Sequence, residues 1–90
     1  MSTENVDKIT VEQCRGARAL LNMTQPELAL AAALGLSTIL DFEKSRRPIS
    51  KEAIKAIRLA LQRAGIEFID ENGGGPGVRL RKRQRPKKPK

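Results

Sequence analysis

Apolar residues recur every three or four positions in the first part of the chain, which is the spacing of a helix that buries one face. This spacing predicts a helix from Thr10 to about Asn22. Thr10 and Gln13 have capping-box spacing, in which the threonine oxygen accepts a free backbone N–H and the glutamine side chain reaches back. The buried stripe of this helix is Val11, Cys14, Ala17 and Leu21. Cys14 is accordingly interpreted as a small core residue rather than an exposed, redox-sensing thiolate.

The second helix has the best-marked start in the chain. Thr24 and Glu27 repeat the capping-box spacing, and Pro26 lies in the first turn, where its missing N–H costs nothing. Gly35 interrupts the helix-forming run, and another short helix is predicted over residues 36–43. The pattern is that of two short helices joined by a tight turn.

A fourth helix is predicted over residues 51–64. Pro48 prevents a continuous helix from the preceding segment, Ser50 provides an N-cap and Gly65 ends the helix. The predicted inner face is Ile54, Ile57 and Leu61. The residues away from this face are Lys51, Lys55, Arg58, Leu59 and Arg63. This helix therefore has a mostly basic outer side with one apolar residue, Leu59.

After Gly65 the apolar period changes from about four to two, which predicts a β-hairpin. Its strands are residues 66–68 and 78–80, separated by a loop of Asn, Gly and Pro. The glycine-rich run at 73–77 is followed by neither Lys-Ser, Lys-Thr nor a helix start, so a phosphate-binding loop is not expected. An isolated two-stranded hairpin is marginal in water, so this one must lie on the helices or on another chain.

Charge is unevenly distributed over the 90 residues, which is the length of one small domain. The formal net charge is +8, from 18 Lys and Arg against 10 Asp and Glu. Eight of the basic residues and none of the acidic ones lie in residues 77–90, so residues 1–76 are neutral as a whole. Within that neutral part, residues 44–63 hold seven basic residues and one acid. Such blocks attract phosphate polymers, although a terminal charge run can also be a solvated tail.

The composition argues against most enzymatic and metal chemistry. The chain has no His and one Cys, so it lacks the commonest general base and metal ligand and cannot form an internal disulfide. No catalytic residue, metal site or cofactor is therefore expected. No apolar run reaches the roughly 18 residues of a membrane span, and the first ten residues lack the basic start of a signal peptide. We expect a cytoplasmic, nucleoid-associated protein that is not an enzyme.

The two short helices carry a resemblance to a known family. The matching residues, in an ungapped register, are Thr24, Gln25, Glu27, Leu28, Ala29, Ser37, Thr38, Ile39, Phe42 and Glu43. On these residues, and on the loop and helix that follow, residues 10–65 resemble the Cro- and lambda-repressor-like helix-turn-helix regulators, the XRE family. Two positions depart from the family pattern, because Ala33 stands where the turn usually has Gly and Gly35 where the next helix usually has a Ser or Thr cap. A shifted register with Gly35 as the turn glycine is the less favoured alternative, since it needs compensating insertions and deletions.

The resemblance implies a mainly α fold, a compact four- to five-helix DNA-binding domain over residues 10–65. A flexible arm is expected at 1–9, a β-hairpin at 66–81 and a disordered basic tail at 82–90. The third helix would enter the DNA major groove. The resemblance implies that its base-facing residues are Leu36, Ser37, Thr38 and Asp41, and that Gln25, next to Thr24, supports the contact with the DNA backbone.

The third helix offers few strong base contacts, because its predicted outer face lacks Arg, Lys, Gln and Asn. Ser37 can bond to a base edge or phosphate, Leu36 can touch a thymine methyl, and Asp41 can accept from cytosine N4. Alternatively, Leu36 and Leu40 are core residues. Affinity would then come largely from backbone contacts, which carry no sequence information. The residues expected to provide them are Lys44, Arg46 and Arg47, with the fourth helix and the tail.

These expectations combine into a sequence-specific transcriptional regulator that binds a palindromic operator as a homodimer and regulates its own gene. The dimer would cover apolar groups that so short a chain leaves exposed. The residues expected at this interface are Leu59, Ile66, Phe68, Val78 and Leu80. Double-stranded DNA and a second copy are the expected partners, without a membrane or small-molecule ligand. The alternatives are an antitoxin-like or adaptor subunit and a non-specific RNA- or DNA-binding protein.

Overall fold

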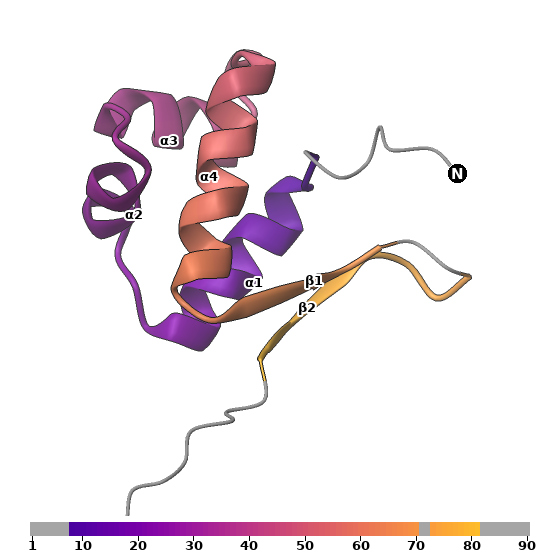
Figure 1. Cartoon of the computed structure of the whole chain (residues 1–90). Helices are drawn as coiled ribbons and strands as arrows, with labels where there is room; N and C mark the ends of the chain where they lie inside the picture. The colour runs from indigo at the N-terminus through magenta and orange to yellow at the C-terminus, as the bar shows by residue number, and fades with distance from the viewer. Residues whose placement is uncertain (1–7, 71–72, 82–90) are drawn as a thin grey trace, which may run out of the picture.

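The computed structural model describes residues 8–70 and 73–81, and within them it shows four helices followed by an antiparallel hairpin (Figure 1). The elements are α1 (Val11–Leu21), α2 (Gln25–Ala32), α3 (Leu36–Glu43), α4 (Lys51–Arg63), β1 (Ile66–Ile69) and β2 (Gly77–Leu80). The predicted mainly α fold with a hairpin after its last helix is confirmed. The expected basic tail lies outside the described residues, as does the expected arm except for Lys8 and Ile9. Ile9 is buried, so the packed body includes it.

The helices start where the capping residues predict. Thr10 Oγ1 accepts from the backbone N–H of Gln13, and Gln13 Oε1 accepts from that of Thr10, both at 2.9 Å. Thr24 and Glu27 form the same reciprocal pair, at 3.2 and 2.9 Å. Ser50 caps α4 through one hydrogen bond of 3.0 Å. Because these bonds satisfy backbone donors that a helix start leaves free, they fix where α1, α2 and α4 begin.

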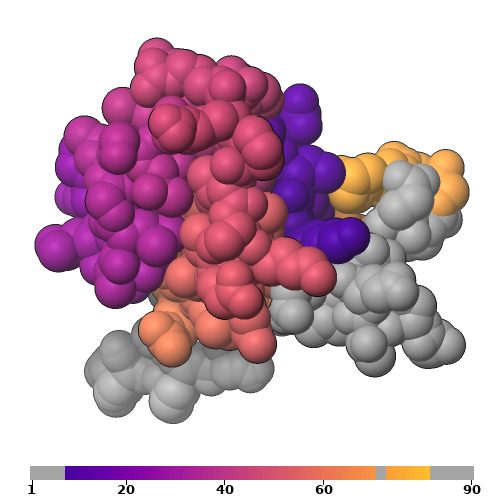
Figure 2. All heavy atoms as spheres, turned by 90° about the horizontal axis from the view of Figure 1, so that it is seen from above, coloured from indigo at the N-terminus to yellow at the C-terminus, as the bar shows by residue number. Residues whose placement is uncertain are grey.

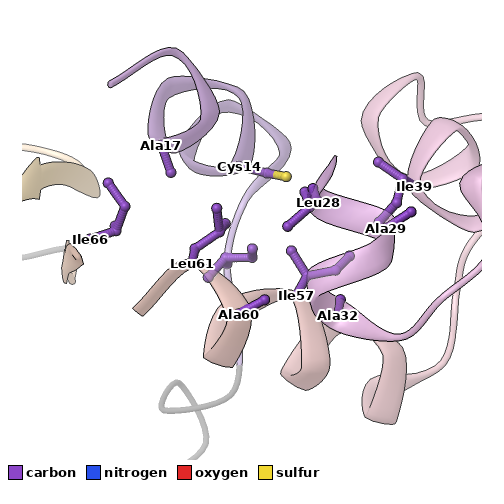
Figure 3. Packing of buried hydrophobic residues seen from close by; sticks show 11 residues of the cluster. Cys14, Ala17, Leu28, Ala29, Ala32, Ile39, Ile57, Ala60, Leu61 and Ile66 are labelled. Atoms are coloured by element: carbon purple, nitrogen blue, oxygen red, sulfur yellow. The ribbon is translucent and has the colours of Figure 1, made fainter. Parts of the chain in front are cut away.

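The hydrophobic core joins all four helices to the first strand (Figure 3). Its largest fully buried apolar side chains are Leu28, Ile39, Ile57, Leu61 and Ile66. Cys14 is fully buried beside them, as predicted for a core residue. The predicted buried stripe of α1 is correct at its centre, because Cys14 and Ala17 are buried. Val11 and Leu21, at the two ends of this helix, are only partly buried.

The hairpin lies against α1 and α4, with Ile66 paired to Leu80 and Phe68 to Val78. Gly16 in the middle of α1 allows this close approach, because a Cβ at that position would lie 3.3 Å from Val78 Cγ2. The hairpin projects from one side of the body, whereas α2 and α3 form the opposite side (Figures 1 and 2). The helices therefore cover one face of the hairpin, as the marginal stability of two strands requires.

Gln13 links α1 to the loop end of the hairpin, where Ile69 pairs with Gly77. Its Nε2 donates to the carbonyl oxygen of Gly77 at 3.0 Å and to that of Ile69 at 3.4 Å. The side chain is buried and serves two purposes, because its Oε1 belongs to the capping box of α1. The sequence predicts only the capping role.

In the described part of the chain, no helix has the length and apolar character needed to cross a membrane.

Candidate nucleic-acid interface

A tight turn with one left-handed residue connects α2 to α3. Ala33 ends α2 with φ 59° and ψ 41°, and the N–H of Leu34 bonds back to the carbonyl of Ala29 at 2.9 Å. Gly35 is the N-cap of α3, with extended backbone (φ −75°, ψ 153°) and no side-chain cap. The ungapped register correctly predicts Ala33, rather than Gly35, at the left-handed position. A left-handed conformation costs a residue with a Cβ about 1–2 kcal/mol.

Helix α3 turns one face to the core and the opposite face outward. Ile39 and Glu43 are buried on the inner face, and Phe42 is partly buried beside them. On the opposite side Ser37 is exposed. Leu36, three residues before Ile39, lies on the flank between the two faces, and it keeps 42% of its surface, so it is not a core residue. The remaining outer residues, Thr38, Leu40 and Asp41, are partly buried.

Asp41 is held by two arginines of the loop after α3. Arg46 Nε lies 3.3 Å from Asp41 Oδ1, and Arg47 Nε lies 3.4 Å from Oδ2. The N–H of Arg46 also donates to the carbonyl of Asp41 at 2.9 Å, and Ser45 takes a left-handed conformation (φ 53°) that folds the loop back. The Asp41 side chain is 21% exposed, and the side chains of Arg46 and Arg47 are more than half exposed. Three residues predicted to contact DNA thus form one cluster beside α3.

A buried carboxylate, Glu43, ties α3 to α1 and α2. It accepts two short hydrogen bonds from Arg18, Nε to Oε2 at 2.8 Å and Nη2 to Oε1 at 2.7 Å. Gln25 Nε2 donates to Oε1 at 3.0 Å and the Cys14 thiol to Oε2 at 3.1 Å. Arg15 donates to the backbone carbonyl of Glu43 at 2.9 Å. Four residues of α1 and α2 therefore fix the end of α3 through Glu43.

This network controls the ionisation of its members. Burial opposes the charged form of Glu43, but the hydrogen bonds from Arg18, Cys14 and Gln25 outweigh it and hold the pKa of the carboxyl below its usual range. The same contact raises the pKa of Arg18. Burial, together with the hydrogen bond to Glu43, raises the pKa of Cys14 well above that of a free thiol. Cys14 therefore stays a neutral donor, which is inconsistent with a reactive thiolate.

A shallow cleft of about 580 Å³ lies where α1 ends, α2 begins and α3 ends. Thr24 and Gln25, at the start of α2, line it together with Lys44 just after α3. Arg15 and Arg18 of α1 add two further basic groups to its wall. The positive end of a helix and basic side chains at one cleft provide the environment that a phosphate group needs. The structure thus brings together Thr24, Gln25 and Lys44, three of the five residues predicted at the DNA backbone.

One basic residue on the outer side of α4, Arg58, is less available to bind a phosphate than the sequence predicts, because it has partners within the chain. The guanidinium of Arg58 lies 4.7 Å from the centre of the Phe68 ring, and its Nη1 donates to the carbonyl of Lys8 at 2.8 Å. Arg58 thus stacks between α4, the hairpin and the start of the body. Lys51, Lys55 and Arg63 are exposed, as expected.

The residues predicted at a dimer interface differ in how far their own chain covers them. Ile66 is fully buried in the core of its own chain, so its side chain is already covered. Phe68 and Val78 pack partly against the same core. Leu80 keeps 51% of its surface and Leu59 keeps 40%. A helix advances about 100° per residue, so Leu59 lies roughly 160° around α4 from the buried Ile57, on the side of the helix away from the core.

Sequence reasoning missed the partners of Glu43. It assigned no role to Arg18 or Arg15, and it interpreted Gln25 only as a support of the backbone contact. One signal was present: Arg18 follows Cys14 by four residues, so a basic side chain lies on the buried face of α1 and requires an acidic partner. Which acid it meets depends on the packing of α3.

Compared with models of protein families and with curated protein sequences, the chain matches none of them.

Proposed function

We propose that this protein is a sequence-specific transcriptional regulator of the XRE helix-turn-helix type, which binds DNA by inserting α3 into the major groove. One observation carries the proposal: the outer face of α3 is open, and cationic groups gather around the C-terminal end of this helix. The Arg46 and Arg47 pair lies at Asp41 in its last turn, and the cleft lined by Lys44, Thr24 and Gln25 lies where the helix ends. Phosphates bound at these two places would fix the position of α3 in the groove.

In this proposal the backbone contacts determine position and the outer face of α3 determines sequence. Gln25, held by Glu43, presents the start of α2 to a phosphate. Arg46, Arg47 and Lys44 neutralise further phosphates. Leu36, Ser37 and Thr38 face base edges. Because two symmetric copies read two half-sites, the operator is palindromic and the protein binds it as a homodimer.

One observation favours an adaptor role as the second candidate. Leu30, on the outer side of α2, keeps 83% of its surface, and the neighbouring Ala31 and Ala33 are also exposed. An apolar outer surface on a helix of this kind fits a protein partner better than a phosphate. An antitoxin-like subunit would use that surface while DNA binding is secondary.

The test is a selection of bound sequences from a random duplex library, followed by footprinting on the DNA upstream of the protein's own gene. Enrichment of one inverted repeat, protected on both halves, is the expected result, and protection upstream of its own gene would support autoregulation. Equal binding to all duplexes and to RNA would support the non-specific alternative. Absence of nucleic-acid binding, with stable capture of one protein partner, would support the adaptor.

A further inference from the structure

The chemistry of the outer face of α3 limits what this helix can read. Residues 36–43 contain no Arg, Lys, Gln or Asn, the side chains that make two hydrogen bonds to one base. Leu36 is 42% exposed in the first turn, and Leu40 follows four residues later on the same flank. The polar groups that α3 can present to DNA are therefore the hydroxyl of the exposed Ser37 and the side chains of the partly buried Thr38 and Asp41.

Asp41 is already committed to other partners. Each of its two carboxylate oxygens lies within 3.4 Å of an arginine Nε, one from Arg46 and one from Arg47. To accept from cytosine N4, the carboxylate would have to give up at least one of these contacts. Its charge also cancels part of the charge of the two arginines, whose exposed sides remain free to meet phosphates. The geometry gives Asp41 a positioning role for the arginines rather than a base-reading role.

Thymine is the only base that presents an apolar group in the major groove, its C5 methyl. We propose that α3 recognises its half-site by packing Leu36 against thymine methyl groups, while Asp41 orients Arg46 and Arg47 toward the DNA backbone. This inference rests on the proposed DNA binding and names its substrate class: half-sites whose thymines are recognised by their methyls. Burying one methyl group corresponds to about fourfold in affinity.

The first experiment replaces thymines of the selected operator by deoxyuridine, one position at a time, which removes the methyl and leaves the pairing unchanged. The full-length protein should lose about fourfold in affinity at one or two positions in each half-site. Leu36→Ala should bind more weakly and lose this sensitivity, because it no longer packs against the methyl. Leu30→Ala, a leucine exposed on α2, is the matched control and should keep it.

The second experiment compares Asp41→Ala with the unchanged protein on a randomised operator library. A positioning role predicts that the affinity changes by the same factor for every sequence and that the sequence preference is unchanged. Loss of a preference for cytosine at one position would show that Asp41 reads that base, and would overturn this part of the inference.

The experiments distinguish a failure of this inference from a failure of the proposed function. Specific binding in which no deoxyuridine position matters overturns methyl reading but leaves the proposed function intact. Absence of any preferred sequence overturns the proposed function and, with it, this inference.

Discussion

Gln13 and Gly77 are joined by a hydrogen bond of 3.0 Å from the buried side-chain amide of α1 to a backbone carbonyl of β2. The same glutamine caps its own helix through its oxygen. Two structural roles are thus combined in one amide group, and each uses a different atom of it.

Gln13→Glu separates these roles. The carboxylate keeps an oxygen for the N–H of Thr10 but has no donor for the carbonyls of Gly77 and Ile69. We expect the free energy of unfolding to fall by roughly 1–3 kcal/mol, because two partly buried acceptors lose their donor. Hydrogen exchange should show faster exchange in the hairpin and unchanged protection in α2 and α3. Gln62→Ala on α4 is the control, and equal loosening of the hairpin in both variants would contradict the anchoring role.

Glu43→Gln should reduce stability and also change its dependence on pH. Breaking a buried ion pair leaves Arg18 uncompensated, which costs about 3–5 kcal/mol. Because the pKa of Glu43 is lowered by folding, its contribution is complete above the unfolded value of about 4.3 and is lost as the pH falls through the folded value. Urea unfolding at a series of pH values should show a steeper acid decline in the unchanged protein than in the variant. Parallel declines would contradict this assignment.

Ala33→Gly should stabilise the protein. Glycine adopts φ 59° without a Cβ clash, so the free energy of unfolding should rise by about 1 kcal/mol despite the greater entropy of glycine in the unfolded chain. Ala31→Gly, two residues earlier within α2, is the matched control and should destabilise by about 1 kcal/mol. Urea unfolding measures both, and two changes of the same sign would refute the strain at Ala33.

Replacing both Arg46 and Arg47 by Ala should weaken binding to all DNA sequences alike. Each lost phosphate contact should reduce the slope of log affinity against log salt concentration by about one unit. Arg79→Ala, an exposed arginine paired with Glu67 on the hairpin, is the control. Titrations of one operator and one unrelated duplex at several salt concentrations provide the measurement. Selective loss on the operator alone would argue against a backbone role.

Leu80→Lys and Leu59→Lys test which surface would form the proposed dimer. Leu80 lies on β2 and Leu59 on α4, and an interface formed by the hairpin predicts that Leu80→Lys separates the subunits while Leu59→Lys leaves them associated. A lysine buried at an interface without a partner is strongly unfavourable. Sedimentation at matched concentrations gives the oligomeric state, with Leu30→Lys as control. Dissociation of Leu59→Lys alone would move the interface to α4, and a monomeric unchanged protein would refute the dimer.

Local rules predicted most of the fold. The Thr10, Thr24 and Ser50 caps, the turn at Ala33 and the change of period after Gly65 depend on residues within four positions of one another, so the sequence contains the whole signal.

Contacts between distant segments were not predictable in the same way. Glu43 has the sequence context of a helix end, and only the packing of α3 on α1 shows that it meets Arg18. Arg58 belongs to a basic run, and only the position of Phe68 shows that its charge is used internally. Ile66 was assigned to an interface because alternation shows that a strand has an apolar side but does not show what covers it.

The bond between Gln13 and Gly77 spans 64 residues of sequence, whereas each helix is built from bonds within a few residues. Closing so long a loop is slow compared with forming a helix, and its entropy is lost before the contact can compensate. The helices should therefore form early and the hairpin should dock last, bringing Ile66 into a core that is incomplete until then. We therefore expect the final folding step to be the docking of the hairpin on α1.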